Sequence, residues 1–217
     1  MSRSEFIESV FYPWAYDARA LCVGFNLPFD LSRLAIGYGL ARKRFANGFS
    51  LKLSNNKFHP RVRIKSLDSK RAFIEFGQVN NGTEYAGRFL DLHTLAFAMT
   101  NKNIDLETAC DHFDAPIKKR RPQTHGKVTE DYVNYNIQDT FSTHSLFQRT
   151  LERYHELRAS IRPERAYSPA SLGKSYLEQM GIKSFLEKNP TFPRQLLGRI
   201  MTTFYGGRAE VKIRKEP

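Results

Sequence analysis

One stretch of sequence decides the fold: Ala20-Leu21-Cys22-Val23-Gly24-Phe25, followed by Asn26-Leu27-Pro28-Phe29-Asp30. Its first part is almost wholly apolar, which is typical of a central strand covered on both faces. From Phe29 to about Gly39 the apolar residues return at helical spacing, so the strand leads directly into a helix. Ligands of α/β sheets bind beyond the carboxyl ends of the strands, which makes this junction a candidate site.

The segments around this stretch continue an α/β pattern. Residues 4–16 predict a helix capped by Ser4, and residues 49–76 alternate like strands of an antiparallel hairpin or edge insertion. Further predicted elements are a strand at 88–92 that ends in a carboxylate, helices at 95–99, 106–113, 129–157 and 168–181, a helix after Pro193 and a strand at 209–213. We therefore expect an α/β domain over residues 1–160 and a helical linker region over 161–217.

Composition indicates a partner with negative charge. The 217 residues include 34 Lys and Arg against 22 Asp and Glu, a formal charge of +12 that favours nucleic acid over a basic protein without such a partner. No apolar run reaches the roughly 18 to 20 residues that span a bilayer, and the amino terminus lacks a secretory pattern, so we expect a cytoplasmic protein without a membrane partner. Cys22 and Cys110 are expected to be buried, reduced thiols.

Two short groups of residues carry candidate chemistry. The first is Asn26 with Asp30 at the strand-to-helix junction, where a polar ligand could be held. The second is Tyr135 with Asp139, whose spacing of four residues puts the phenol and the carboxylate on one helix face. Each has a plain structural alternative. Asp30 would complement the helix dipole while Asn26 shapes the turn, and Tyr135 would pack in the core while Asp139 faces solvent.

Taken together, these groups fit metal-dependent hydrolysis of a phosphodiester. That reaction requires several carboxylates around ions about 3.5 to 4 Å apart and a group that positions the attacking water. Asp30 and Asp139 are hard oxygen ligands suited to Mg²⁺ or Mn²⁺, and Tyr135 could orient the water.

The Asn-x-x-Phe-Asp and Tyr-x-x-x-Asp pair resembles the second and third motifs of the DEDDy 3′–5′ exonucleases, the proofreading domains of family B DNA polymerases. Residues 167–174 and 205–210 resemble the region where plasmid-borne and phage-like members pass from exonuclease to polymerase. The resemblance covers nearly the whole chain. It implies a ribonuclease H-like exonuclease fold, single-stranded DNA or a primer 3′ end as partner, and a polymerase domain in the same polypeptide.

The resemblance also implies roles for individual residues. Asp30 and Asp139 would bind the catalytic metals, Asn26 and Phe29 would contact the 3′ end, and Tyr135 would position the nucleophilic water. A Tyr-x-Gly-Gly-like element, which in the family touches the DNA strand, would comprise Tyr205, Gly206, Gly207 and Arg208. A plain helix-ending turn is the structural alternative for that element.

The family's first motif, Asp-x-Glu on the opening strand, does not precede these residues. The literal Asp105-Leu106-Glu107 follows the second motif and opens an amphipathic helix, so we interpret Asp105 as a helix cap without a metal. We expect the chain to be an internal piece of a polymerase, with little nuclease activity alone and an exposed edge at the strand over residues 20–25.

Other residues receive structural interpretations. Asp91 could assist a metal or water, but packing is the preferred interpretation, and His93, His125 and His144 lack metal-site spacing. Residues 118–121 fit either a phosphate contact or a solvated loop. Two rival functions stay open. One is a non-catalytic nucleic-acid-binding protein on a ribonuclease H-like scaffold. The other is a DEDDy nuclease of RNA, which the polymerase-like Tyr205-Gly206-Gly207 stretch argues against.

Overall fold

The computed structural model describes residues 1–77, 85–117 and 129–202. The chain divides into two compact units, Met1–Gln179 and Met180–Pro217. Helix α6 (Pro169–Gln179), which the sequence placed in the linker region, lies in the first unit, where its Leu172 and Ser175 are buried. The described part of the second unit holds α7 (Phe185–Lys188), the short helix η5 (Arg194–Leu196) and α8 (Leu197–Thr202). The strand predicted at 209–213 lies outside the described residues.

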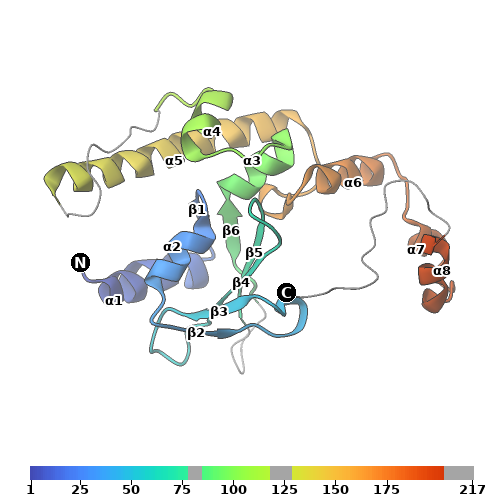
Figure 1. The fold of residues 1–217 in the computed structure, drawn as a ribbon, viewed down its shortest axis with the longest axis horizontal. Coiled ribbons are helices and arrows are strands. Elements are labelled where there is room, and N and C mark those ends of the chain that lie inside the picture. The colour runs from blue at the N-terminus through green and yellow to red at the C-terminus, as the bar shows by residue number, and fades with distance from the viewer. Residues whose placement is uncertain (78–84, 118–128, 203–217) are drawn as a thin grey trace, which may run out of the picture. The chain divides into compact units, whose positions relative to one another are not determined.

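A pair of parallel strands, β1 (Leu21–Gly24) and β6 (Arg88–Asp91), confirms two predicted strands. Leu21 lies opposite Arg88 and Gly24 opposite Asp91, so both strands end at the same edge. Within the described residues β1 pairs with β6 alone, in agreement with the expected open edge. The carboxyl ends of the pair point toward helices α3 (Leu92–Thr100) and α5 (Glu130–Glu156) (Figure 1).

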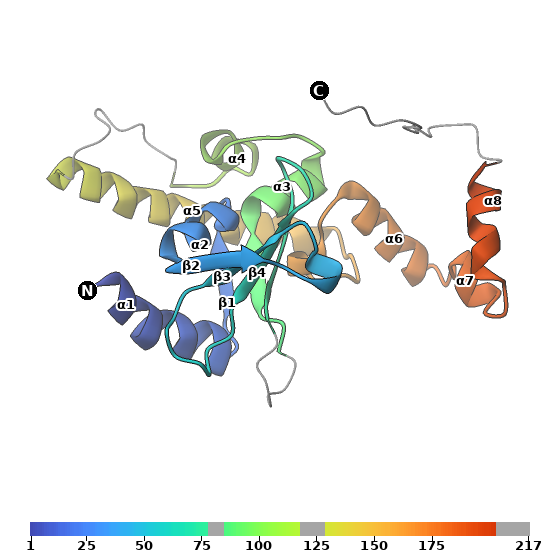
Figure 2. The same ribbon diagram turned by 60° about the horizontal axis from the view of Figure 1, so that its bottom comes forward.

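An antiparallel sheet follows, as the alternation over residues 49–76 predicted. Its order is β2-β3-β4-β5, and Figure 2 shows β2, β3 and β4 crossing in front of the parallel pair. Strand β5 continues toward β6 through a hydrogen bond from the backbone N–H of Phe76 to the carbonyl of Ala86. The four strands are β2 (Gly37–Leu40), β3 (Phe49–Lys52), β4 (Val62–Ser66) and β5 (Ala72–Phe76).

The helix after β1 is shorter than predicted. Helix α2 (Leu27–Leu34) ends before Ala35, and residues 37–39, predicted as the last turn of the helix, lie in β2 instead. Gly37 and Gly39 disfavour a helix, and the N–H of Ile36 donates to the carbonyl of Lys52 on β3. Pairing with β3 therefore overrides the helical spacing of the apolar residues.

The remaining helices agree with the prediction in type and differ at their ends. The first, α1 (Arg3–Phe6), is capped by Ser2, which forms a capping box with Glu5, and not by Ser4. It continues through two segments of wide π-helical turns around Pro13, which has no N–H to donate. The other elements are η1 (Ile7–Phe11), η2 (Pro13–Asp17), η3 (Lys43–Phe45), α4 (Leu106–His112) and η4 (Pro163–Arg165).

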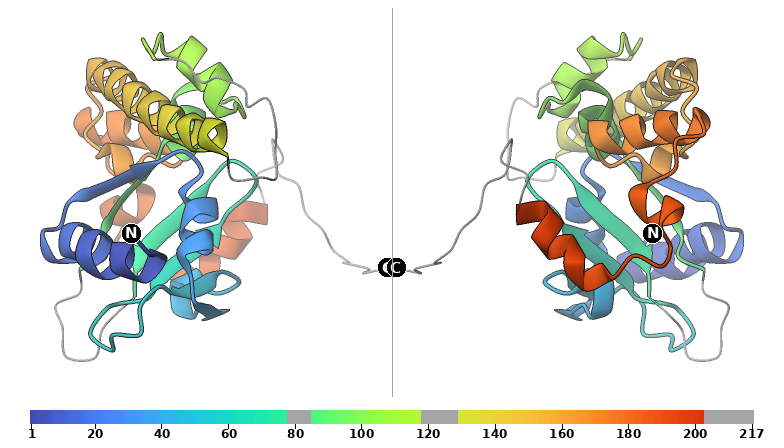
Figure 3. Two further views of the ribbon diagram at one scale, coloured as in Figure 1. Left: turned by 90° about the vertical axis from the view of Figure 1, so that its left-hand side faces the viewer. Right: turned by 90° about the vertical axis from the view of Figure 1, so that its right-hand side faces the viewer.

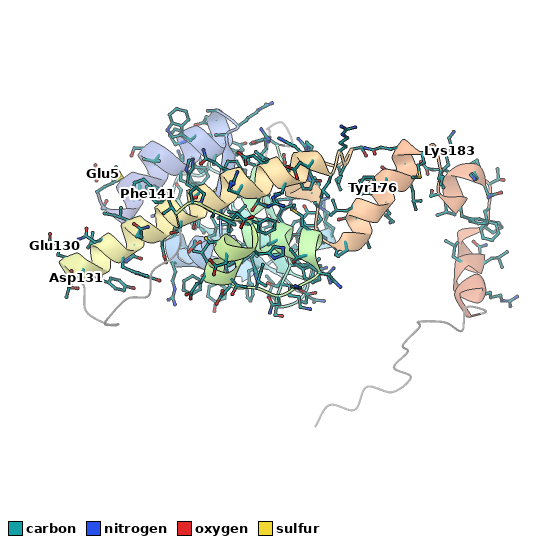
Figure 4. The ribbon with its side chains drawn as sticks, turned by 90° about the horizontal axis from the view of Figure 1, so that it is seen from above. Glu5, Glu130, Asp131, Phe141, Tyr176 and Lys183 are labelled. Carbon is teal, nitrogen blue, oxygen red and sulfur yellow. The ribbon has the colours of Figure 1, made fainter. Side chains whose placement is uncertain are left out.

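Two apolar clusters hold the first unit together. One joins the amino-terminal helix and α2 to the antiparallel sheet, and the other joins β6 to α3, α4, α5 and α6. Figure 3 shows α3, α4 and α5 at one end of the strands and β2 and β3 at the other. The amino-terminal part of α5, with Glu130 and Asp131 at its end, extends beyond α4 (Figure 4). Across the described ranges, no helix has both the length and the apolar character that crossing a membrane requires.

Tyr12 provides a test of the first cluster. It is 1% exposed, and its hydroxyl donates to the carbonyl of Pro60 at 2.7 Å. We expect Tyr12→Phe to lower the free energy of unfolding by about 1 to 2 kcal/mol, because a buried acceptor loses its donor. Urea unfolding measures the change. Tyr38→Phe is the control, since Tyr38 is 76% exposed, and an equal effect of both variants would contradict the assignment.

Candidate functional site

A cavity of about 1260 Å³ lies at the carboxyl end of the parallel strands. Its walls come from the end of β1, the start of α2, the segment between α3 and α4, and one face of α5. Among the described residues that line it, the charged side chains are three carboxylates, Asp30, Asp105 and Asp139, and no Lys or Arg. We call it the carboxylate cavity.

The structure brings four of the predicted site residues together here. Asn26, Phe29 and Asp30 reach the cavity from the β1–α2 junction, and Asp139 reaches it from α5. Tyr135, one turn before Asp139, is half-buried beside Tyr132 and is not among the lining residues. The predicted role of Tyr135 stays a prediction. The element at residues 205–208 lies outside the described residues.

The β1–α2 junction is a tight turn with a strained residue. Asn26 adopts a left-handed conformation with φ of 66°, which asparagine tolerates better than most residues. Its side-chain amide makes no capping hydrogen bond to α2. The turn approaches Gly24 closely: a Cβ there would lie 2.6 Å from Cδ2 of Leu27, so a larger residue would displace the Leu27 side chain. Asn26 therefore shapes the turn and also lines the cavity.

Asp91 holds this turn in place. It is 7% exposed, and its Oδ1 accepts hydrogen bonds from the N–H groups of Asn26 at 2.7 Å and Leu27 at 3.1 Å. Its Oδ2 accepts from the N–H and the hydroxyl of Thr94, so Asp91 is the N-cap of α3. Four donors thus occupy the carboxylate, and it does not line the cavity. The structural interpretation of Asp91 is supported, with a positioning role for the site.

Electrostatics distinguish Asp30 from an ordinary surface carboxylate. Although its side chain is open to the cavity, desolvation and, secondarily, the negative charge of Asp91 raise its pKa. The same neighbourhood affects Cys22 on β1: burial and the charge of Asp30 raise the pKa of that thiol to about 11. Cys22 is only partly buried, whereas Cys110 is buried as expected. A positive charge beside Asp30 would relieve the repulsion.

Other polar groups of the cavity were not predicted. His93 and His144 both line it, and the Nε2 of His93 lies 2.9 Å from Oδ1 of Asn103 in a hydrogen bond. Asp105 caps α4 by accepting from the N–H of Thr108, as predicted, and also reaches the wall. The sequence held a signal for the α5 wall of the cavity, because the lining residues recur at spacings of three and four and so share one helix face. They are Asn136, Asp139, Thr140, Thr143, His144 and Phe147.

The carboxylates fit a hydrated divalent cation better than a fully protein-bound one. Mg²⁺ usually keeps several waters and binds one or two carboxylates together with substrate phosphates. Asp30 and Asp139 supply donors of that kind. In the part of the chain that the structure describes, no group of three or more His, Cys, Asp or Glu side chains is placed to hold a metal ion. A phosphate ligand would therefore have to complete the coordination.

We expect Asp30→Asn to raise the free energy of unfolding at neutral pH. The pKa of Asp30 is higher in the folded protein than in the unfolded chain, so stability falls as the pH rises through the interval between the two values. Asparagine does not titrate, so Asp30→Asn removes this loss of stability. The gain in the free energy of unfolding should therefore be present above the raised pKa of Asp30. It should vanish as the pH falls toward the ordinary Asp pKa of about 3.9. Urea unfolding between about pH 4 and pH 8 measures the difference.

Asp68→Asn is the matched control with the opposite sign. A side-chain hydrogen bond from Arg71 lowers the pKa of Asp68, so ionised Asp68 stabilises the fold above the ordinary Asp range. Its replacement should lower stability at neutral pH. An Asp30→Asn protein that shows no pH-dependent gain would contradict the electrostatic description of the cavity.

Comparison with known proteins does not assign this chain to a family. No family model, curated protein or solved structure matches it. The architecture is mixed α/β, with a parallel pair, an antiparallel sheet and flanking helices. The carboxylate cavity is the candidate functional site of that architecture.

Proposed function

We propose that this chain is the 3′-end-binding part of a proofreading 3′–5′ exonuclease of ribonuclease H-like fold within a DNA-directed DNA polymerase. One observation carries the proposal: Asp30 and Asp139, which lie far apart in the sequence, line the same cavity beside Asn26 and Phe29. These are the residues that the resemblance to the DEDDy exonucleases assigns to metal and 3′-end binding. The net charge of +12 supports a polyanionic ligand.

Phe29 supports a single-stranded rather than a duplex ligand. It lies at the cavity wall with 53% of its surface exposed, and the guanidinium of Arg33 lies 4.8 Å from its ring centroid. An exposed aromatic ring offers a face on which an unpaired base stacks. The Asn26 amide, held on the adjacent turn, can donate to and accept from that base or its sugar. Together they would orient the terminal nucleotide.

The absence of Lys and Arg among the described lining residues supports a role for a metal. A phosphate would otherwise approach three carboxylates without a compensating charge. Asp30 and Asp139 would hold Mg²⁺ or Mn²⁺ there, and the bound ion would supply an activated water and charge stabilisation for phosphodiester hydrolysis. Two carboxylates form only part of a two-ion site, so metal-dependent binding of the strand is the first activity to measure.

A non-catalytic nucleic-acid-binding protein is the second candidate. The observation that favours it is the lack, among the described residues, of a group of three metal-binding side chains. In that case the cavity would bind a strand through stacking and amide contacts, and divalent ions would not alter its affinity.

We expect Asp30→Asn and Asp139→Asn each to weaken Mn²⁺ binding by at least about tenfold, because each removes a charged ligand. Electron paramagnetic resonance of free Mn²⁺, with and without a short single-stranded oligonucleotide, measures this affinity. Asp68→Asn is the control, since Asp68 lies outside the cavity. Mn²⁺ affinity that is unchanged in both cavity variants would defeat the metal assignment. Mn²⁺-independent oligonucleotide binding would then favour the second candidate.

We expect Phe29→Ala to weaken binding of single-stranded DNA by about 1 to 3 kcal/mol, the range for loss of one stacked base. Duplex binding should change little, because paired bases do not present a free face. Fluorescence anisotropy with labelled single-stranded and duplex DNA measures both. Phe49→Ala is a matched control, because Phe49 is also 53% exposed but lies on β3. Equal losses in the two variants would argue against stacking at the cavity.

A further inference from the structure

A second polar cluster lies on the antiparallel sheet, around a buried carboxylate. Glu75 on β5 is 4% exposed and is surrounded by the guanidinium groups of Arg44, Arg63 and Arg165, which we call the arginine cluster. Arg165 donates to Oε1 at 3.2 Å. Oε2 faces Arg44 and Arg63 at ion-pair range without a well-aligned hydrogen bond. One carboxylate is thus shared by three cations.

A cavity of about 300 Å³ opens beside this cluster. Among the described residues that line it, the charged ones are Lys43, Arg44 and Arg63 against Glu75, which leaves an excess of two positive charges in that set. Arg165, on the other carboxylate oxygen, neutralises Glu75 from outside the lining. Neutralising one buried carboxylate requires one cation, so the remaining guanidinium groups are in surplus.

Arg63, whose side chain is mostly buried, is held in place before any ligand arrives. The guanidinium groups of Arg63 and Arg44 lie 4.9 Å and 5.4 Å from the ring centroid of Phe45, which is 2% exposed. Arg63 also donates to the carbonyl of Phe76 at 3.1 Å. Fixed donors of this kind lose little entropy when a ligand binds.

One residue of the cavity wall, Arg63, has a donor without a hydrogen-bond acceptor among the described residues. It is the Nε–H, a buried atom. A buried donor without an acceptor is costly. The missing group should therefore be rich in acceptors and negatively charged.

We propose that the cavity beside the arginine cluster binds a phosphate group. A phosphate offers several acceptor oxygens and the negative charge that the surplus cations lack, and guanidinium groups recognise it in a bidentate manner. The phosphate could belong to a nucleic-acid backbone or to a free phosphate or nucleotide. The site shares no residue with the carboxylate cavity, so it goes beyond the proposed function and can be tested separately.

The test compares Arg44→Gln with Arg42→Gln in the whole chain. Arg44 is 65% exposed, so its replacement should not disturb folding, which circular dichroism verifies. Arg42 is a matched control because it is exposed, lies two positions away and does not line the cavity. One arm titrates inorganic phosphate by calorimetry. The other measures oligonucleotide affinity against salt concentration.

We expect Arg44→Gln to weaken binding in at least one arm by about tenfold relative to Arg42→Gln, the loss typical of a charged hydrogen bond. If the ligand is a single strand, the slope of log affinity against log salt should fall by about 0.7, the value for one lost phosphate contact. If it is a free phosphate, calorimetry alone should change. Equal behaviour of the two variants in both arms would overturn the proposal, and the arginines would then serve only Glu75.

Glu75→Gln gives a second test with the opposite sign. It removes the charge that competes for the arginines and keeps the shape, so phosphate binding should become several-fold tighter. A folded Glu75→Gln protein that binds phosphate more weakly than the wild type would also overturn the proposal.

Discussion

The buried carboxylate of Asp91 ties together the two strands whose ends form the carboxylate cavity. It is the last residue of β6. It accepts hydrogen bonds from the backbone N–H groups of Asn26 and Leu27, in the turn between β1 and α2. Charge-assisted hydrogen bonds of this kind are stronger than neutral ones. Since Leu27 begins α2, the position of Asp30 in the first turn of that helix follows from this clamp. The other oxygen caps α3, so one side chain organises both helices at this edge.

The clamp has an electrostatic consequence for the site it builds. A second carboxylate, Asp30, is held near Asp91, and its pKa is raised by desolvation and by that charge. Asp139 and Asp105 add further negative charge to the walls. We propose that such a cavity would accept a phosphate through a divalent cation, whereas the arginine cluster around Glu75 would accept one directly. The two proposed sites would therefore bind the same class of ligand, one through a metal ion on carboxylates and the other through guanidinium groups.

Local signals in the sequence were sufficient for most elements. The apolar run before Asn26 predicted β1, the alternation over residues 49–76 predicted β3, β4 and β5, and the α5 pattern predicted a long helix. Residues 37–39 were predicted wrongly as helix because the apolar residues up to Tyr38 recur at helical spacing, while pairing with β3 is a long-range interaction. His93 and His144 were set aside on spacing, since nothing local indicates that α3 and α5 meet at one cavity.

By itself, the sequence determined the α/β class, the strand-to-helix junction at Asn26 and the helix cap at Asp105, because these depend on neighbours within a few residues. The resemblance to the DEDDy exonucleases also supplied the hypothesis that Asp30 and Asp139 act at one site. Only the tertiary structure decided that both carboxylates line one cavity, that Asp91 clamps the junction and that three arginines converge on Glu75. Those arrangements join residues distant in the chain, and their positions are set by strand pairing and core packing rather than by local propensity.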